Sequence, residues 1–393
     1  MLPTVQGFRF AAISAGIRKD GRIDLALCEA SEGSTVAGVF TRNLVRAAPV
    51  TIATERVQRP GARAVLVNAG CANACTGEPG LAAARDSTAA VAEALGLEPD
   101  SVLPASTGVI GALLPADKIR SRARELVAKL SPAGAEDFSK AILTTDRWPK
   151  VESTRLQTAN GAATLLAIGK GAGMIHPDVG PPHATMLVFL FTDARIPQPL
   201  LGRVLSRATD DTFNVCSVDG DTSTNDTVLA FASGQSGVEV DEAELARGFF
   251  DVCDRLARSM VADGEGAEHA VEVCVSGLAD DQAARQVART VATSLLVKTA
   301  LFGRDANWGR ILAAAGRAGV PFDPSASSLT IGDVEIVRKG LGLGAEAEAR
   351  AATVLAQAAY RIELSLGSGT GRGRYLTSDL GHGYVDVNAD YRS

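Results

Sequence analysis

The sequence predicts an α/β fold, a layered sandwich in which helices cover sheets. Short apolar or alternating runs recur along the chain, each bounded by Gly, Pro or Asn as strands are. Between them lie longer segments with apolar residues at three- and four-residue spacing, which is typical of amphipathic helices. Strands followed by covering helices favour layers of sheet and helix around a core. These patterns leave the strand order open.

The elements are expected in a definite order along the chain. The expected strands are residues 35–40, 62–70, 162–171, 185–192, 269–277 and 329–337. The expected helices are residues 81–97, 116–130, 241–262 and 345–363. The last two helices are long enough to cover a sheet face. The segment "GSGTGRGR" (367–374) lacks the strand-then-helix context of a dinucleotide-binding loop, so a surface hairpin is expected there.

Composition limits the classes of function. The 393 residues leave two domains or one large α/β body open, and 46% of them are hydrophobic, enough for a large core. A net charge of −6 argues against a nucleic-acid partner, which would need clustered Lys and Arg. The six cysteines are expected to be reduced thiols, and no apolar run approaches the roughly 18–20 residues that span a bilayer. We therefore expect a cytoplasmic protein without a membrane partner.

Two polar segments invite a chemical interpretation. In "ASTGVIG" (105–111) a hydroxyl precedes spaced glycines, and such a segment can direct an O–H and a backbone N–H at one point, as an oxyanion hole requires. The alternative is an ordinary turn after a strand. The second segment, "SVDGDTSTNDT" (217–227), is expected to be a hydrogen-bonded polar loop near a site. It lacks the glutamate and glycine placement of a calcium-binding loop.

A threonine stands where a loop rich in proline meets an apolar strand, in "IHPDVGPPHATMLVFLFTDA" (175–194). A threonine hydroxyl is activated when threonine is the first residue of a chain, because its own α-amine then acts as the base. That amine has an ordinary pKa of about 7.7–8.0, so much of it is neutral near physiological pH. A free amine at Thr185 would require cleavage after the small Ala184. The alternative is a threonine that merely begins a strand.

Several blocks along the chain resemble the ornithine acetyltransferase family, also called bifunctional glutamate N-acetyltransferase. The resemblance runs nearly end to end and includes, in the family's order, the blocks "VNAGCANACTGEPG", "ASTGVIG", "TTDRWPK", "KGAGMIHP", "ATMLVFLFTDA", "SVDGDTSTNDTV", "LVKTALFGRDANWGRI" and "VNADYRS". It implies a layered α-β-β-α sandwich of the DmpA/ArgJ-like type, which is similar to N-terminal-nucleophile enzymes. It also implies self-cleavage between Ala184 and Thr185 into an α chain (1–184) and a β chain (185–393), assembled as an α2β2 heterotetramer.

The resemblance implies a ping-pong reaction and the residues that carry it. Thr185 would take the acetyl group from N2-acetylornithine, and glutamate would accept it. Thr107 and Gly108 would form the oxyanion hole. The implied substrate contacts are Thr145, Lys170, Thr185, Glu265, Asn388 and Ser393. No metal or nucleotide cofactor is implied, and acetyl-CoA is a candidate second donor. The side chains suit these roles, because a lysine can pair with an α-carboxylate and a glutamate with an ammonium group.

The sequence departs from the family's pattern at a few positions. The link "PDVGPPHAT" before the nucleophile is about four residues longer than usual, with Asp178 at the customary asparagine position. Cys71 replaces another customary asparagine, and Ser393 replaces a terminal threonine but keeps the hydroxyl. Three alternatives stay open: an N-terminal-nucleophile hydrolase or aminopeptidase of the same fold, an acetyltransferase of secondary metabolism, and an uncleaved relative that only binds amino acids.

Overall fold

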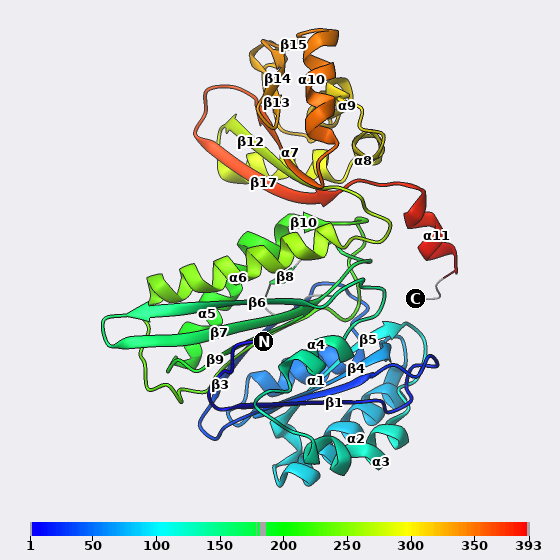
Figure 1. Cartoon of the computed structure of the whole chain (residues 1–393), viewed down its shortest axis with the longest axis vertical. Coiled ribbons are helices and arrows are strands. Elements are labelled where there is room, and N and C mark those ends of the chain that lie inside the picture. Colours follow the sequence, from blue (N-terminus) through cyan, green and yellow to red (C-terminus); the bar gives the residue numbers. More distant parts are fainter. Residues whose placement is uncertain (1, 178, 181–185, 391–393) are drawn as a thin grey trace. The chain divides into compact units, whose positions relative to one another are not determined.

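The chain forms two compact units, which Figure 1 shows in a computed structural model that describes residues 2–177, 179, 180 and 186–390. Unit 1 comprises Met1–Asn214 and Asp221–Leu256, and unit 2 comprises Val215–Gly220 and Ala257–Arg392. The boundary expected between an α and a β chain, at residues 184 and 185, therefore lies inside unit 1. That cleavage would divide one compact unit, so its two products would share a core.

Two sheets form the centre of unit 1, with strand orders β1-β2-β4-β5 and β6-β7-β9-β11-β3-β8. Their strands are β1 (Phe8–Ile13), β2 (Leu25–Ala30), β3 (Thr35–Thr41), β4 (Ala64–Cys71), β5 (Val102–Val109), β6 (Lys150–Thr158), β7 (Gly161–Lys170), β8 (Val179–Gly180), β9 (Leu187–Thr192) and β11 (Thr227–Ala232). The helices are α1 (Ala48–Val57), α2 (Gly77–Leu95), the 3-10 turn η1 (Pro99–Ser101), α3 (Ala116–Ala128), α4 (Ala135–Ala141), α5 (Gln198–Thr212) and α6 (Glu242–Ala262), whose last turns lie in unit 2.

The two sheets of unit 1 pack face to face, because alternate side chains of each strand point to opposite faces. Phe8 and Phe10 of β1 lie in the core shared with the second sheet, whereas Ile13 lies in the core under α2 and α3. Between the sheets the ring of Phe10 meets that of Phe191 edge to face, with centroids 5.0 Å apart. Helices α5 and α6 cover the outer face of the second sheet. The predicted α-β-β-α layers are thus confirmed.

One mixed sheet organises unit 2, in the order β10-β17-β12-β16-β13-β14-β15. Its strands are β10 (Cys216–Ser217), β12 (Ala270–Leu278), β13 (Ser328–Ile331), β14 (Val334–Arg338), β15 (Leu341–Gly342), β16 (Ala359–Ser365) and β17 (Gly371–Ser378). Its helices are α7 (Asp281–Ala292), α8 (Leu295–Phe302), α9 (Trp308–Gly316), η3 (Pro324–Ala326), α10 (Ala345–Leu355) and α11 (His382–Asp390); the turn η2 (Phe213–Val215) joins the two units. Helix α7 packs on β12 and β17, where a Cβ on Gly373 would lie 2.3 Å from the backbone nitrogen of Arg285.

Two of the expected elements of unit 2 were wrong. Residues 329–337 form two strands, because β13 turns at Gly332 (φ +61°) and pairs antiparallel with β14. The helix expected to reach residue 363 ends at Leu355, and residues 359–365 form β16. The helical spacing of apolar residues continues past the end of α10 into β16. This strand alternates buried and exposed residues and pairs with β12 and β13. Pairing with strands distant in sequence overrides a local helical pattern.

The glycine-rich segment 367–374 is not a hairpin, so that prediction was also wrong. Strands β16 and β17 both pair with β12, on its opposite sides, so the link between them crosses the end of β12. A Cβ on Gly369 would lie 2.1 Å from the carbonyl oxygen of Leu278. The glycines therefore allow two backbones to approach closely, which side chains would prevent.

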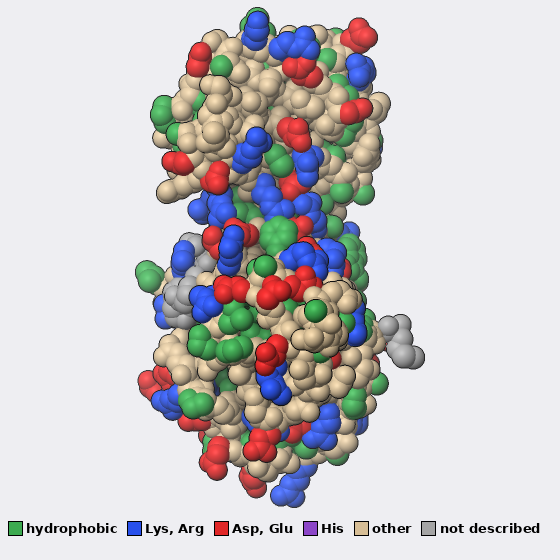
Figure 2. Space-filling view, turned by 90° about the vertical axis from the view of Figure 1, so that its left-hand side faces the viewer, with side chains coloured by type: hydrophobic (Ala, Val, Ile, Leu, Met, Phe, Trp, Pro, Cys, Tyr) green, Lys and Arg blue, Asp and Glu red, His purple; other side chains and the backbone are tan. Residues whose placement is uncertain are grey.

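The described surface carries both signs of charge. Lys and Arg side chains alternate with Asp and Glu side chains on the face that Figure 2 shows. Within the described residues, no helix is both long and apolar enough to cross a membrane. All six cysteines are free thiols, as the sequence predicted.

Candidate active site

The predicted oxyanion pair lies near the end of β5, next to β4. Thr107 is 9% exposed, and Gly108 pairs with Gly70 across the parallel ladder. Gly108 has φ +130°, and a Cβ there would lie 2.4 Å from the carbonyl carbon of Gly70 and 2.6 Å from the nitrogen of Cys71. A glycine is therefore required at 108 both by its dihedral angle and by the neighbouring backbone. The close approach fixes the backbone beside the Thr107 hydroxyl.

The polar loop at residues 217–227 supports these strand ends. The Asn225 side chain donates hydrogen bonds to the carbonyl oxygens of Ala72 (2.6 Å) and Ser106 (2.9 Å). The Ser106 hydroxyl in turn donates to the side-chain oxygen of Asn68 at 2.6 Å. Asn225 and Ser106 are buried, so these bonds replace lost contacts with water. The loop is thus a hydrogen-bonded structure beside Thr107, in line with the interpretation preferred from the sequence.

Lys170 ends β7 and is 6% exposed. Its ammonium donates to the hydroxyl of Thr144 at 2.8 Å and lies 3.7 Å from a carboxylate oxygen of Asp146. The predicted contact Thr145 lies between these two partners in the sequence and is partly exposed. A buried lysine beside a hydroxyl-bearing loop can bind a carboxylate, because water competes little for its charge.

Asp146 is the centre of this group. Its side chain accepts hydrogen bonds from Lys150 (2.7 Å) and from the backbone nitrogens of Gly171 (2.7 Å) and Thr144 (3.1 Å). Burial alone would raise the pKa of Asp146. The charges of Lys170 and Lys150 and the Gly171 hydrogen bond outweigh burial and hold that pKa well below its usual range. Asp146 is therefore an anion between two cations, which leaves this group with one net positive charge.

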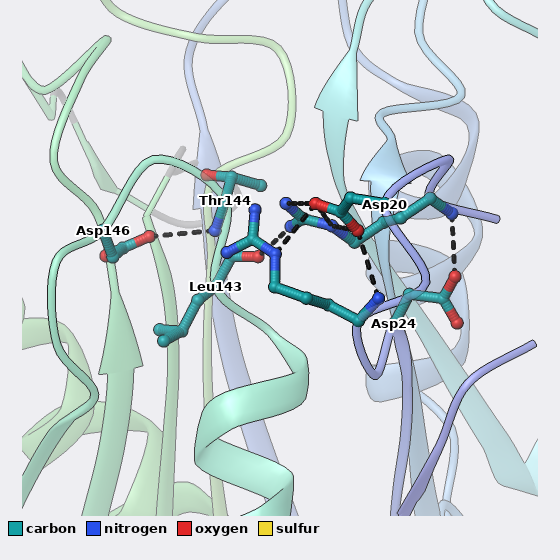
Figure 3. Close-up of polar contacts among 7 residues, drawn as sticks. Asp20, Asp24, Leu143, Thr144 and Asp146 are labelled. Carbon is teal, nitrogen blue, oxygen red and sulfur yellow. Dashed lines mark hydrogen bonds and ion pairs between the residues drawn. The ribbon is translucent and has the colours of Figure 1, made fainter. Parts of the chain in front are cut away.

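A second loop fixes the segment that carries Thr144 and Asp146, as Figure 3 shows. Arg18 donates from its guanidinium to the carbonyl oxygen of Leu143 at 2.7 Å and ion-pairs with Asp20 at 2.9 Å. The backbone nitrogen of Arg18 donates to Asp24 at 2.8 Å. Arg18 thus ties residues 143–146 to the loop between β1 and β2.

The predicted nucleophile lies outside the described residues, as does Ala184. The strand that follows is placed by its pairings: Leu187 lies opposite Lys170 in the β7–β9 ladder. The carbonyl oxygen of Met186 accepts a hydrogen bond from the nitrogen of Thr227 at 2.7 Å. The strand expected at 185–192 is therefore confirmed over Leu187–Thr192, and it begins beside Lys170.

Unit 2 brings Glu265 and Asn388 together. The amide nitrogen of Asn388, on α11, donates to the Glu265 carboxylate at 2.8 Å. Gly266 (φ +69°) allows the turn to lie against α11, because a Cβ there would be 2.2 Å from the nitrogen of Tyr384. Asp379 accepts from the nitrogens of Glu268 and His269, both at 3.0 Å, and so ties the turn to the start of α11. Ser393 lies outside the described residues.

Two further features of the described residues bear on the site, namely the metal-ligating side chains and one cavity in unit 2. Among the described residues, no group of three or more His, Cys, Asp or Glu side chains could hold a metal ion. A cavity of about 590 Å³ in unit 2 is lined by Arg258, Glu272 and Arg361 among others, but by none of the predicted site residues. Glu272 accepts from both arginines at 2.8 Å, so one carboxylate is shared between two cations in the wall of this cavity.

Sequence reasoning missed three residues of unit 1 that organise the site. Asp146 stands inside the block "TTDRWPK" that carried the resemblance, and Asn225 inside the polar loop, but neither was assigned a role. Arg18 contacts Leu143 across 125 positions of sequence. The polar blocks themselves were the available signal for the first two. Arg18 also stands inside a block of the resemblance, "GFRFAAISAGIRKDGRIDLAL", but no local pattern predicts its contact, because Leu143 is distant in the chain.

Known proteins resemble the chain over its full length. The sequence matches the ArgJ family over residues 9–393. The arginine biosynthesis bifunctional protein ArgJ of Nitratidesulfovibrio vulgaris is 47% identical over 100% of both chains. The protein of the same name from Geobacter sulfurreducens is 46% identical over 99% of this chain and 100% of its own. A crystal structure of the arginine biosynthesis bifunctional protein ArgJ from Bacillus halodurans is 38% identical, covers 52% of this chain and 98% of its own, and has a TM-score of 0.50. The chain therefore belongs to the ArgJ family.

Proposed function

We propose that the protein transfers an acetyl group from N2-acetylornithine to glutamate in arginine biosynthesis, through an acetyl ester on Thr185. Family membership supports the reaction, and the names of the relatives support the pathway. The observation that carries the proposal is buried Lys170 opposite Leu187, two residues after the proposed nucleophile. Two residues span at most about 7 Å, so a carboxylate on Lys170 would be near the reacting hydroxyl.

The nucleophile is made by self-cleavage. The Thr185 hydroxyl attacks the carbonyl carbon of Ala184, and the peptide bond becomes an ester as the α-amine of Thr185 is freed. Water then hydrolyses the ester and releases the carboxyl group of Ala184. The free amine next serves as the base for its own hydroxyl. Placement of the bond inside unit 1 supports this step, because the shared core would hold both products together.

Acetyl transfer then has two halves. The Thr185 hydroxyl attacks the acetyl carbonyl of N2-acetylornithine while the α-amine of Thr185 takes its proton. That amine then passes the proton to the N2 nitrogen, the acetyl–nitrogen bond breaks, and ornithine leaves. Glutamate attacks the acetyl ester through its own amine, which regenerates the hydroxyl. Thr107 and Gly108 would donate to the oxyanion in both halves, and loss of one such donor costs about 10²–10³ in rate. Acetyl-CoA could acylate the same hydroxyl with release of its thiol.

Two groups would hold the substrates. Lys170, with Thr144 beside it, would bind the α-carboxylate that donor and acceptor share, and Thr145 is a further contact implied by the resemblance. Glu265, Asn388 and Ser393 are further substrate contacts implied by the resemblance. An α2β2 assembly in the cytoplasm completes the proposal. No metal or nucleotide cofactor enters it.

Intact mass and N-terminal sequencing of the purified protein test the nucleophile directly. We expect two chains, one beginning Thr-Met-Leu-Val at residue 185. Thr185→Ala should stay a single inactive chain, whereas Thr185→Ser should still cleave because it keeps the hydroxyl. An active Thr185→Ala variant would refute the mechanism.

The rival with the best claim is an N-terminal-nucleophile hydrolase, since it needs the same free threonine. The two functions differ in what resolves the acetyl ester. Rapid ornithine release from N2-acetylornithine without glutamate would favour the hydrolase. We expect release to stop near one equivalent per Thr185 until glutamate is added.

A further inference from the structure

The two carboxylate oxygens of Asp146 make different contacts. One oxygen accepts from Lys150 and from the nitrogen of Gly171, both at 2.7 Å. The other accepts from the nitrogen of Thr144 at 3.1 Å and lies 3.7 Å from the ammonium of Lys170. The first oxygen thus ties Asp146 to the backbone immediately after β7. The second faces the groups proposed to hold the substrate.

The side chains of Asp146 and Lys150 are both 0% exposed, and that of Lys170 is 7% exposed. Buried charges are strongly destabilising when they lack a partner, so the Asp146 carboxylate stabilises the charges of both lysines. An ammonium has three N–H donors. Within the described residues, Lys170 uses one on Thr144, and its contact with Asp146 is too long for a hydrogen bond. Lys170 therefore keeps donor capacity for a ligand while Asp146 holds its charge in place.

We infer that Asp146 is a positioning residue, which holds Lys170 and Thr144 where they receive the α-carboxylate of the amino-acid substrate. This inference rests on the proposed function, since it concerns the proposed carboxylate site. Lys150 has the complementary task of neutralising Asp146, so that the net positive charge belongs to Lys170. The site then selects substrates with a carboxylate at this end.

Equilibrium binding tests the inference without requiring turnover. The ligands are ornithine and putrescine, which is ornithine without its carboxylate. The variants are Asp146→Asn and the double variant Asp146→Asn with Lys150→Met, which removes one negative and one positive buried charge and so keeps the net charge of the group. Titration calorimetry gives the Kd of each ligand, and circular dichroism reports folding.

A matched control is available in the same unit. Asp193 is 2% exposed and accepts from the nitrogens of Thr164 (2.7 Å) and Gln6 (3.3 Å). It follows the far end of β9, and a strand rises about 3.3 Å per residue, so it lies roughly 20 Å from Leu187. Asp193→Asn removes a comparable buried carboxylate and should leave both Kd values unchanged.

The expected result is a selective loss. A hydrogen bond to a charged group contributes about ten- to a hundredfold in affinity, so the folded double variant should raise the Kd of ornithine by about that factor. The Kd of putrescine should not change. Equal Kd values for ornithine in the wild type and the double variant would overturn the inference. It would also be overturned if the affinity for putrescine fell by the same factor, or if the wild type did not bind ornithine. A wild type that binds ornithine selectively through Asp146 but transfers no acetyl group would instead refute the proposed function alone.

Discussion

Gly108→Ala should damage both stability and catalysis, because the new Cβ has no space. It would lie 2.4 Å from the carbonyl carbon of Gly70 and 2.6 Å from the nitrogen of Cys71, whereas carbon atoms pack best at about 3.5–4.0 Å. Both neighbours are backbone atoms of β4, so β4 and β5 must separate by about 1 Å. Overpacking costs about 1–3 kcal/mol and a strained dihedral such as φ +130° another 1–3 kcal/mol. We expect a loss of about 2–6 kcal/mol in the free energy of unfolding.

Gly96→Ala is the matched control. Gly96 also has a positive φ, +70°, where it ends α2, but a Cβ there would meet no atom within 4 Å. This variant should lose only about 1–2 kcal/mol from the dihedral angle. Urea unfolding gives both free energies. Acetyl transfer gives kcat, which should fall about 10²-fold or more for Gly108→Ala, since a shift of about 1 Å would misplace the proposed oxyanion donors. A Gly108→Ala protein as stable as Gly96→Ala, with unchanged kcat, would refute the reasoning.

Two further predictions concern a loop and a buried lysine. Arg18→Ala should raise the KM for N2-acetylornithine about tenfold or more, because the Leu143 carbonyl loses a charged donor at 2.7 Å. The control is Arg22→Ala, which removes only a surface ion pair with Asp20. Equal KM values in the two variants would contradict the prediction. Burial lowers the pKa of Lys298 to about 8, against the opposing charge of Asp379. The unfolded chain therefore binds the proton up to a higher pH than the folded chain does, so unfolding free energy should rise between about pH 8 and 10.4, by up to about 3 kcal/mol. The free energy of urea unfolding of Lys298→Met should lack this rise. Identical pH profiles for the variant and the wild type would contradict the prediction.

Local patterns predicted most elements, because burying one face of a helix or strand imposes a regular spacing on its apolar residues. The runs that became β7 and β9 carry near-continuous apolar residues, as central strands do, and α6 carries a clear amphipathic stripe. The blocks of the family resemblance also pointed to Lys170 and to the loop that holds Asn225. The periodic patterns are decided by neighbours within a few residues and the blocks by residue identity, so the sequence alone contains both.

Apart from the local hairpin of β13 and β14, the errors occur where partners are distant. Residues 359–365 form a strand because β12 and β13 lie on either side, and the glycines after it cross β12 rather than turn back. Asp146 acquires its role only when Gly171 and Lys170 approach it, and Arg18 only when Leu143 does. The sequence by itself determined the layers, the family and the chemical types at the site. Only the tertiary structure decided strand order, the crossing over β12 and the charge balance around Lys170, because each depends on contacts between segments far apart in the chain.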